Sequence, residues 1–362
     1  MTTMRRARGF SLIELMLALA LGVVVTAGIV TLFVGNNQTY TLLNGQSRMQ
    51  ENARFSVDFM TRSARAAGYF GCDPEPSKIY KTLNGAWPQL FEVDITTPIQ
   101  AYHGINAANG VNDWTPSLTT LPRVGSAVGF IPANGIDITK LRQQSDILVL
   151  RHVQVPGARI AAIVQSDVNP TVEIPATVLE FAADQFLAIN NCEQATVFRV
   201  ANIGVAGAVG TLVRDVAPAV GLGLYENTPA APLAPAGVPY GEANNAQGTS
   251  VGRVLTDIYY VAQGTAANNR GQTPWSLWRK TSEDAPVELI EGVELLRVRF
   301  GIDVTPNNLI NAANRYVTYD QVAANVIRAL RIVVTANSVD VVSDAGAPMA
   351  RTFSQTISFR NN

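Results

Sequence analysis

The sequence predicts an α+β fold in which one long N-terminal α-helix packs on an antiparallel β-sheet and carries an enlarged, β-rich head. Three observations predict it: an apolar run near the N-terminus, an amphipathic pattern directly after it, and strand-like alternation in the last third of the chain. At 362 residues, 47% of them hydrophobic, the chain is long enough to bury a full core. The 27 basic and 28 acidic residues nearly cancel, which argues against a general affinity for nucleic acid.

Residues 10–34 are free of charged side chains except for Glu14 and are long enough to cross a membrane. As a helix rising about 1.5 Å per residue they would span roughly 38 Å, more than a hydrocarbon core of about 30 Å requires. A secretory signal has a shorter apolar region, and the Val-Thr-Ala sequence at 25–27 is a poor cleavage site, so we expect the segment to be retained. Three arginines among residues 5–8 predict a cytoplasmic N-terminus. The sequence therefore predicts a single-pass protein of the bacterial inner membrane with residues 35–362 in the periplasm.

Residues 35–72 are expected to continue the helix in an amphipathic form. No proline occurs before Pro74, and apolar residues recur at spacings of three and four, which places them on one helix face. Charged residues occupy the other face, so this half should lie across the head, in a helix from Phe10 to Gly68 of roughly 88 Å. The apolar stripe consists of Met49, Ala53, Val57, Met60, Ala64 and Ala67.

Four glycines lie within this predicted helix, and each costs about 1 kcal/mol relative to alanine. They either mark places where the helix bends or melts when it is packed in an assembly, or they reflect the frequency of glycine in membrane helices. Both explanations remain open at this point. The four positions are Gly22, Gly28, Gly35 and Gly45.

Residues 73–362 predict a β-rich globular head. Leu296, Val298, Phe300 and Ile302 alternate with residues that include two arginines, as expected of a strand with one wet face and one face packed on the helix stripe. The segments of the C-terminal part that are expected to form strands are 257–262, 276–280, 287–303, 326–338 and 352–362.

The middle of the chain predicts a second β-rich lobe. Strands are expected at 146–153, 178–182 and 196–200, and the Gly/Ala-rich segment 204–210 is explained best as a hairpin connection. Residues 227–250 carry four prolines and three glycines with few large apolar side chains, which predicts a flexible loop.

Few residues suggest catalysis or cofactor binding. The two histidines, His103 and His152, are too few for a histidine-rich metal site, and we expect them at surface or loop positions. The sequence contains no phosphate-binding loop, nucleophile elbow or EF-hand pattern. Trp275 and Trp278, which could stack on a ligand, are better explained as sheet residues. We therefore expect a protein that is not an enzyme, with no metal, no cofactor and no small-molecule substrate.

The stretch RRARGFSLIEL, residues 5–15, resembles the class III signal of the type IV pilin and pseudopilin superfamily. That signal is a short basic leader ending in glycine, followed by phenylalanine and by glutamate at the fifth mature position. The resemblance implies a type IV pilin-like fold, removal of the leader (1–9) by prepilin peptidase between Gly9 and Phe10, and N-methylation of Phe10. Loss of the three leader arginines would leave 24 basic and 28 acidic side chains, a net charge of −4.

Glu14 needs a partner because a charged residue at mid-membrane costs about 2.5 to 3.5 kcal/mol on insertion scales. The resemblance implies that Glu14 pairs with the Phe10 amine of a neighbouring subunit and thereby sets the axial register during assembly. The alternative is that Glu14 extends its side chain to the lipid headgroups without a protein partner.

A second resemblance concerns QENARFSVDFMTRSARAAGYFGC, residues 50–72, in which an arginine-rich helix runs into an Ala-Gly-Tyr turn and a cysteine. This stretch is similar to PilW-type minor pilins, and the five C-terminal strand segments resemble the strands of the same family in the same order. The resemblance implies a structural subunit that primes or caps the type IV pilus at its tip and supports twitching motility and adhesion. Its implied partners are other minor pilins, the major pilin, prepilin peptidase and the pilus assembly platform. A J-type pseudopilin of type II secretion and a minor pilin for DNA uptake are the alternatives.

The sequence contains two cysteines, Cys72 and Cys192. An oxidising compartment makes a disulfide between them plausible, and a closed loop of this length would add about 4 to 5 kcal/mol of stability on the chain-entropy model. Two separate buried thiols are the alternative, because cysteine is often buried.

Overall fold

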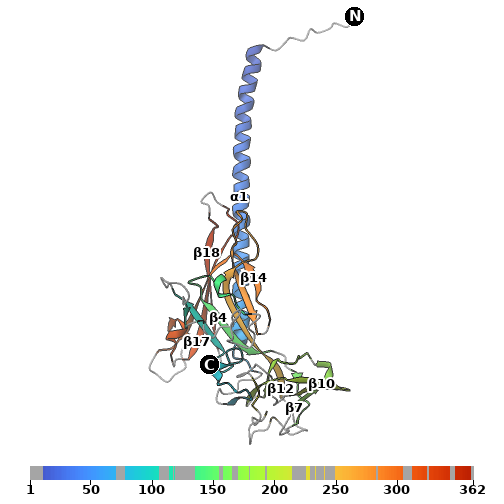
Figure 1. Ribbon diagram of the computed structural model, residues 1–362. Coiled ribbons are helices and arrows are strands. Elements are labelled where there is room, and N and C mark those ends of the chain that lie inside the picture. Colours follow the sequence, from blue (N-terminus) through green and yellow to red (C-terminus); the bar gives the residue numbers. More distant parts are fainter. Residues whose placement is uncertain are drawn as a thin grey trace.

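The computed structural model shows one long helix, α1 (Leu12–Ala66), that emerges from a β-rich head (Figure 1). The predicted α+β architecture is confirmed, with a long N-terminal helix on antiparallel sheets. The residues that the structure describes are 11–70, 78–105, 114–116, 118, 135–154, 158–164, 170–178, 180–191, 194–213, 226–228, 233, 240, 249–282, 284–304, 312–323, 326–342 and 347–359.

Helix α1 is unbroken over 55 residues and is buried in the head only in its second half. At about 1.5 Å per residue it is roughly 80 Å long. Burial begins at Gly45, ten residues beyond the start of the predicted amphipathic half. The predicted apolar stripe is confirmed: four of its members are core residues and two are partly buried against the same core. The four are Met49, Ala53, Met60 and Ala64, and the two are Val57 and Ala67.

The helix ends in the predicted Ala-Gly-Tyr turn. Gly68 has φ +80, a left-handed conformation that favours glycine, and the Tyr69 N–H donates to the Ala66 carbonyl at 3.0 Å. The Gly68 N–H donates to the carbonyl of Arg151 at 3.0 Å, so the chain leaves the helix already bonded to the head.

The last turn of α1 is also bonded to strand β12 (Ser250–Gln263). The Ser63 hydroxyl donates to Asp257 Oδ2 at 3.0 Å and lies 2.8 Å from the Tyr259 hydroxyl. Burial, followed by the negative charge of Asp257, raises the pKa of Tyr259 to about 12, so the phenol stays protonated at neutral pH. Hydrogen bonds therefore supplement apolar packing at this end of the helix.

The proximal sheet packs on α1 and has the order β16-β15-β17-β18. Side chains at every second position of these strands point into the core beneath the helix, which confirms the period-two pattern. The strands are β15 (Val293–Ile302), β16 (Arg315–Val317), β17 (Ile327–Asn337) and β18 (Ala350–Ser358). A short 3-10 turn, η8 (Tyr319–Gln321), lies between β16 and β17.

The large sheet has the order β1-β9-β8-β12-β4-β2-β3, with β5 and the β13–β14 hairpin joined to β12. β12 pairs with β8 through Ser250–Arg253 and with β4 and β13 further along. This one strand therefore joins the part of the large sheet that contains β8 to the part that contains β4 and β13. The remaining strands are β1 (Ile79–Lys81), β2 (Ile99–Gly104), β3 (Trp114–Thr115), β4 (Ile147–Val153), β5 (Ala158–Arg159), β8 (Phe186–Asn190), β9 (Ala195–Arg199), β13 (Trp275–Thr281) and β14 (Val287–Glu291). The 3-10 turns η2 (Trp87–Gln89) and η5 (Ile138–Lys140) lie in connections around this sheet.

The predicted strand 287–303 is wrong as a single strand, because it is divided between two sheets at Gly292. This glycine has φ +75, and a Cβ atom there would lie 2.7 Å from Val339 Cγ2 and 2.9 Å from the Asn337 carbonyl oxygen. The turn carries the chain from β14, at the edge of the large sheet, into β15 of the proximal sheet.

A distal lobe lies beyond the C-terminal end of α1 and contains the sheet β10-β11-β7-β6 (Figure 1). The predicted second β-rich lobe is confirmed, as are strands at 146–153 and 196–200 and the hairpin at 204–210. The predicted strand 178–182 is wrong: its described residues are not in a strand, and the 3-10 turn η6 (Ala176–Val178) ends at the first of them. The alternating buried residues Val172 and Ile174 lie before that turn. The strands of this sheet are β6 (Ala162–Val164), β7 (Thr171–Pro175), β10 (Asn202–Ala206) and β11 (Val209–Val213).

Most of the predicted flexible loop 227–250 lies outside the described residues. Two of its described members, Leu233 and Tyr240, are buried in the core of the distal lobe. The Tyr240 hydroxyl lies 2.6 Å from the Thr196 hydroxyl of β9. At these two points the segment is fixed to the lobe.

Asp146, just before β4, joins the large sheet to the proximal sheet. Its side chain is 1% exposed, and its carboxylate accepts the Val298 N–H at 2.7 Å and the Gly104 N–H at 3.0 Å. Because these donors come from both sheets, one buried carboxylate holds the two sheets together. The side chains paired with it are His103 (2.8 Å), Arg297 (3.1 Å) and Arg299 (3.2 Å).

Replacing Asp146 by asparagine should lower the free energy of unfolding by about 3 kcal/mol, because the partner charges lose their buried counter-charge. Asp58→Asn is the matched control, since Asp58 also pairs with an arginine, at 2.6 Å, but on the exposed face of α1. The control should change stability by less than about 0.5 kcal/mol. Urea unfolding of the detergent-solubilised protein measures both, and equal effects of the two variants would contradict the role of Asp146.

His152 lies in strand β4 and is partly buried, so its predicted surface or loop position is wrong. Burial lowers the pKa of His152 below its ordinary value of 6.5, and nearby Asp257 opposes this shift. Below pH 6.5 the unfolded chain therefore takes up a proton at His152 that the folded chain resists, and stability falls as pH falls. We expect His152→Gln to make the free energy of unfolding less dependent on pH between 7 and 5, as measured by urea unfolding at several pH values. An unchanged pH dependence would contradict this assignment.

Candidate functional site

The N-terminal half of α1 is bare of contacts with its own head and is the candidate functional surface. Among the described residues, α1 is the one helix whose length and apolar composition suffice for crossing a membrane. Its large apolar side chains are exposed: Leu12, at the start of the helix, is 76% exposed, and Phe33, near the end of this half, is 71% exposed. A surface this apolar is stable only in lipid or against other apolar helices.

Glu14 is the third residue of α1, and its carboxylate caps the first turn. The Ser11 N–H donates to Glu14 Oε2 at 3.0 Å. This bond uses one carboxylate oxygen, and the side chain remains exposed at the membrane end of the helix. Gly9 and Phe10, the predicted processing residues, lie outside the described residues, so the pairing of Glu14 with a Phe10 amine stays a prediction.

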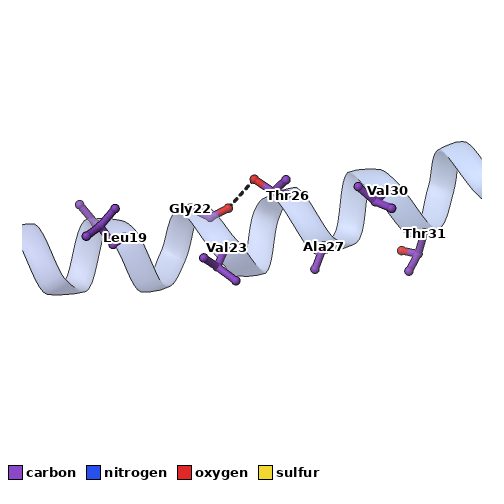
Figure 2. Close-up of a pocket in the computed structure, with 8 residues that line it drawn as sticks. Leu19, Gly22, Val23, Thr26, Ala27, Val30 and Thr31 are labelled. Atoms are coloured by element: carbon purple, nitrogen blue, oxygen red, sulfur yellow. Dashed lines mark hydrogen bonds between the residues drawn. The ribbon is translucent and has the colours of Figure 1, made fainter.

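A shallow apolar groove runs along one face of this exposed half (Figure 2). Ala18, Gly22 and Thr26 follow one another at four-residue spacing, and their small side chains form the bottom of the groove. The Thr26 hydroxyl donates to the Gly22 carbonyl at 2.7 Å, drawn as the dashed line in Figure 2. Because the hydroxyl is satisfied by its own helix, the floor is apolar. Small residues at this spacing allow the backbones of membrane helices to approach closely.

The same pairing of threonine with glycine occurs at two further turns. Thr31 donates to the Gly28 carbonyl at 2.8 Å, and Thr39 donates to the Gly35 carbonyl at 2.9 Å. The helix is continuous through these glycines in the single subunit. Any bend or melting at them would arise in an assembly, so the two explanations offered by the sequence both stay open.

The fourth glycine, Gly45, has a different role, because it lies where α1 leaves the head. A Cβ atom there would be 2.8 Å from Val342 Cγ1 and 3.3 Å from Ser338 Cβ. Three residues on, Arg48 pairs with Asp340 at 3.4 Å. We call residues 338–342 the collar, since they contact the helix at this exit point.

The collar is tied in turn to the loop between β12 and β13. Asn269 donates from Nδ2 to the Val341 carbonyl at 3.0 Å and accepts the Val341 N–H at 3.0 Å, and its own N–H donates to Asp340 Oδ1 at 3.0 Å. These bonds fix the direction in which the exposed half projects from the head. The sequence does not predict the collar, because the residues it contacts, such as Gly45 and Asn269, lie far from it in the chain and the contacts follow no repeating pattern.

The other predicted site residues are placed as follows. Cys72 and Cys192 lie outside the described residues, so the disulfide stays a prediction. His103 lies in β2 and is bonded to Asp146, so its predicted surface or loop position is also wrong. In the described part of the chain, no group of three or more His, Cys, Asp or Glu side chains could hold a metal ion.

Two family models match the chain, at its two ends. Residues 4–30 match the Prokaryotic N-terminal methylation motif, and residues 258–361 match Type IV Pilus-assembly protein W. The first match contains the predicted cleavage site and Glu14, and the second runs from β12 through β18, over the strands that pack on α1. No curated protein and no solved structure matches the chain. The exposed helix with its methylation motif and the matched C-terminal sheet thus make the chain similar, at both of its ends, to type IV pilus-assembly proteins of the PilW type.

Proposed function

We propose that this chain is a minor pilin that primes or caps assembly of the type IV pilus at the tip, and thereby supports pilus biogenesis, twitching motility and adhesion. The observation that carries the proposal is the division of α1 into an exposed apolar half and a half that forms the core of the head. Before assembly the exposed half would lie in the inner membrane, with the head in the periplasm. Prepilin peptidase would remove residues 1–9, and the assembly platform would then bring the helix against those of other minor pilins and the major pilin.

The distal lobe supports a position at the tip. It extends past the C-terminal end of α1, on the side away from the membrane half (Figure 1). In a fibre of parallel, staggered subunits the space beyond each head belongs to the next subunit. A lobe in that space is accommodated most easily where no further subunit follows.

The alternative functions are supported less well. A J-type pseudopilin of type II secretion would share the helix and the proximal sheet, but the matched family is a pilus-assembly family. DNA uptake would need a free basic patch on the head. On the outer face of the proximal sheet Arg297 and Arg299 are paired with Asp146, and Arg331 lies 3.8 Å from the ring centre of Tyr316. These arginines are engaged within the head, which favours the assembly role.

Replacing Glu14 separates its two roles. Glu14→Gln keeps an oxygen that can accept the Ser11 N–H but loses the negative charge, whereas Glu14→Ala loses both. If the charge pairs with a neighbouring Phe10 amine, both variants should be processed normally, with a mature chain starting at N-methylated Phe10 by intact mass. Both should then enter sheared pili at least about tenfold less than the wild type. A Glu14→Gln variant that assembles normally would mean that Glu14 only caps its helix.

Gold labelling of an epitope tag on the distal lobe tests the proposed position. Inserted at the exposed β10–β11 turn, at Gly207, the tag should label one end of each fibre in electron micrographs. The same tag on the major pilin serves as the control and should label the whole shaft. Labelling of the present chain along the shaft would contradict the tip assignment.

We also propose the disulfide between Cys72 and Cys192. In the chain Cys192 falls between β8 and β9, and β9 pairs with β1, the first strand after Cys72, so strands near both cysteines meet at one sheet edge. Cys72→Ser and Cys192→Ser should each lower the free energy of unfolding by up to about 4 kcal/mol, and the double variant should lose no more than either. Two free thiols by Ellman titration of the unfolded, non-reduced wild type would exclude the bond.

A further inference from the structure

Strand β14 forms an open edge of the large sheet, beside α1. Among the described residues it pairs with β13 alone, and the register between them shifts at Leu277 and Trp278. The far end of the strand touches the helix, where Asn52 Nδ2 donates to the Glu291 carbonyl at 3.0 Å. Figure 1 shows β14 on the opposite side of α1 from β18. An open edge offers unpaired main-chain N–H and C=O groups to another extended chain.

A groove of about 600 Å³ follows this edge. It is lined by six consecutive residues, 286–291, together with Thr265 and Trp278. Its course along a strand is the shape expected of a site for an extended polypeptide rather than for a compact small molecule.

Buried polar atoms at this groove lack partners within the described part of the chain. They are Trp278 Nε1, a donor, and Glu288 Oε1, an acceptor, both on residues that line the groove. Glu288 is held in place, because its other oxygen accepts the N–H (3.0 Å) and hydroxyl (2.6 Å) of Thr265. The main-chain groups of the β14 edge, which pairs with β13 alone among the described residues, match a ligand that supplies both N–H and C=O groups. A peptide backbone supplies both.

The charge of the edge specifies the side chains of that ligand. Glu288 and Glu291 give the groove a negative character, and Val287, 53% exposed, adds an apolar contact. A complementary strand would carry lysine or arginine next to apolar residues. Since β14 lies beside α1, a neighbour whose helix runs parallel to α1 would bring its own head to this edge.

We propose that the β14 groove, lined by 286–291, Thr265 and Trp278, binds an extended, basic strand of the head of a neighbouring pilin subunit, which adds to the large sheet as an extra strand. The inference rests on the proposed function, since it requires that the chain meets other pilins side by side. It assigns to this edge the lateral contact between heads, separate from the contact between membrane helices.

The test is photo-crosslinking in cells with the full-length chain. A benzoylphenylalanine at Val287, in the groove, should form an adduct with another pilin, and peptide mass spectrometry should map it to an extended segment bearing lysine or arginine. The same probe at Val205, 62% exposed on β10 of the distal lobe, is the position control. Glu291→Lys should lower the adduct yield from Val287 at least about tenfold, because it places like charges together. Glu180→Lys, at an exposed glutamate of the distal lobe, should change it less than about twofold.

A second variant guards against misfolding as the cause of a loss. Glu288→Gln keeps an oxygen for Thr265 but replaces the free acceptor by a donor, and it should lower the yield with unchanged thermal stability. If the chain is present in sheared pili but Val287 yields no pilin adduct, or an adduct with a protein outside the pilin family, the groove assignment is wrong while the proposed function stands. A wild-type chain absent from pili overturns both.

Discussion

The packing of one helix face against two sheets is the interaction on which the rest of this structure depends. The stripe from Met49 to Ala64 is the shared floor of the proximal sheet and of part of the large sheet, and both contribute residues to a single core. Burial of apolar side chains supplies most of the stability of such a core. The helix that forms the floor of this core also carries the exposed apolar half. A change that shifts the exposed half relative to the head therefore also disturbs the core.

Polar contacts give this core a definite geometry. Apolar packing is not directional, so it does not by itself set the angle between two sheets or the exit path of a helix. Asp146 sets the angle between the two sheets, because it accepts hydrogen bonds from both. The collar sets the exit path of the helix, because it contacts Gly45 and Arg48. Ser63 fixes the other end of the helix to β12. The exposed half therefore leaves the head in a fixed direction, which suits the proposed role as a subunit of an ordered fibre.

The features that the sequence predicts well are those with a regular period. The helix stripe repeats at about 3.6 residues and β15 at two, and both patterns are present in the structure. β17 lies within one residue of its expected bounds, whereas β12, which is buried on both faces, begins seven residues before the expected start at 257. The division at Gly292 was missed because the apolar pattern continues across it, and the turn depends on a close approach to Asn337 and Val339. Asp146 was missed because its partners lie about 40 and 150 positions away in the chain. The arginines that pair with it were expected on a wet face, and they do lie on that face, but they are bonded there to a carboxylate from another sheet.

The long strand β12 has a mechanical consequence. It is bonded to β8 near its start and to β4 and β13 further along, and it is also the strand to which the last turn of α1 is bonded. In the proposed function, retraction of the pilus pulls on the helix while an attached surface holds the distal lobe. The tension then passes along the backbone of β12, and neighbouring strands resist it through many hydrogen bonds loaded together in shear rather than broken one by one. One continuous strand, supported on both sides and bonded to the helix through Ser63, thus links the end of α1 to β8, in place of a flexible hinge.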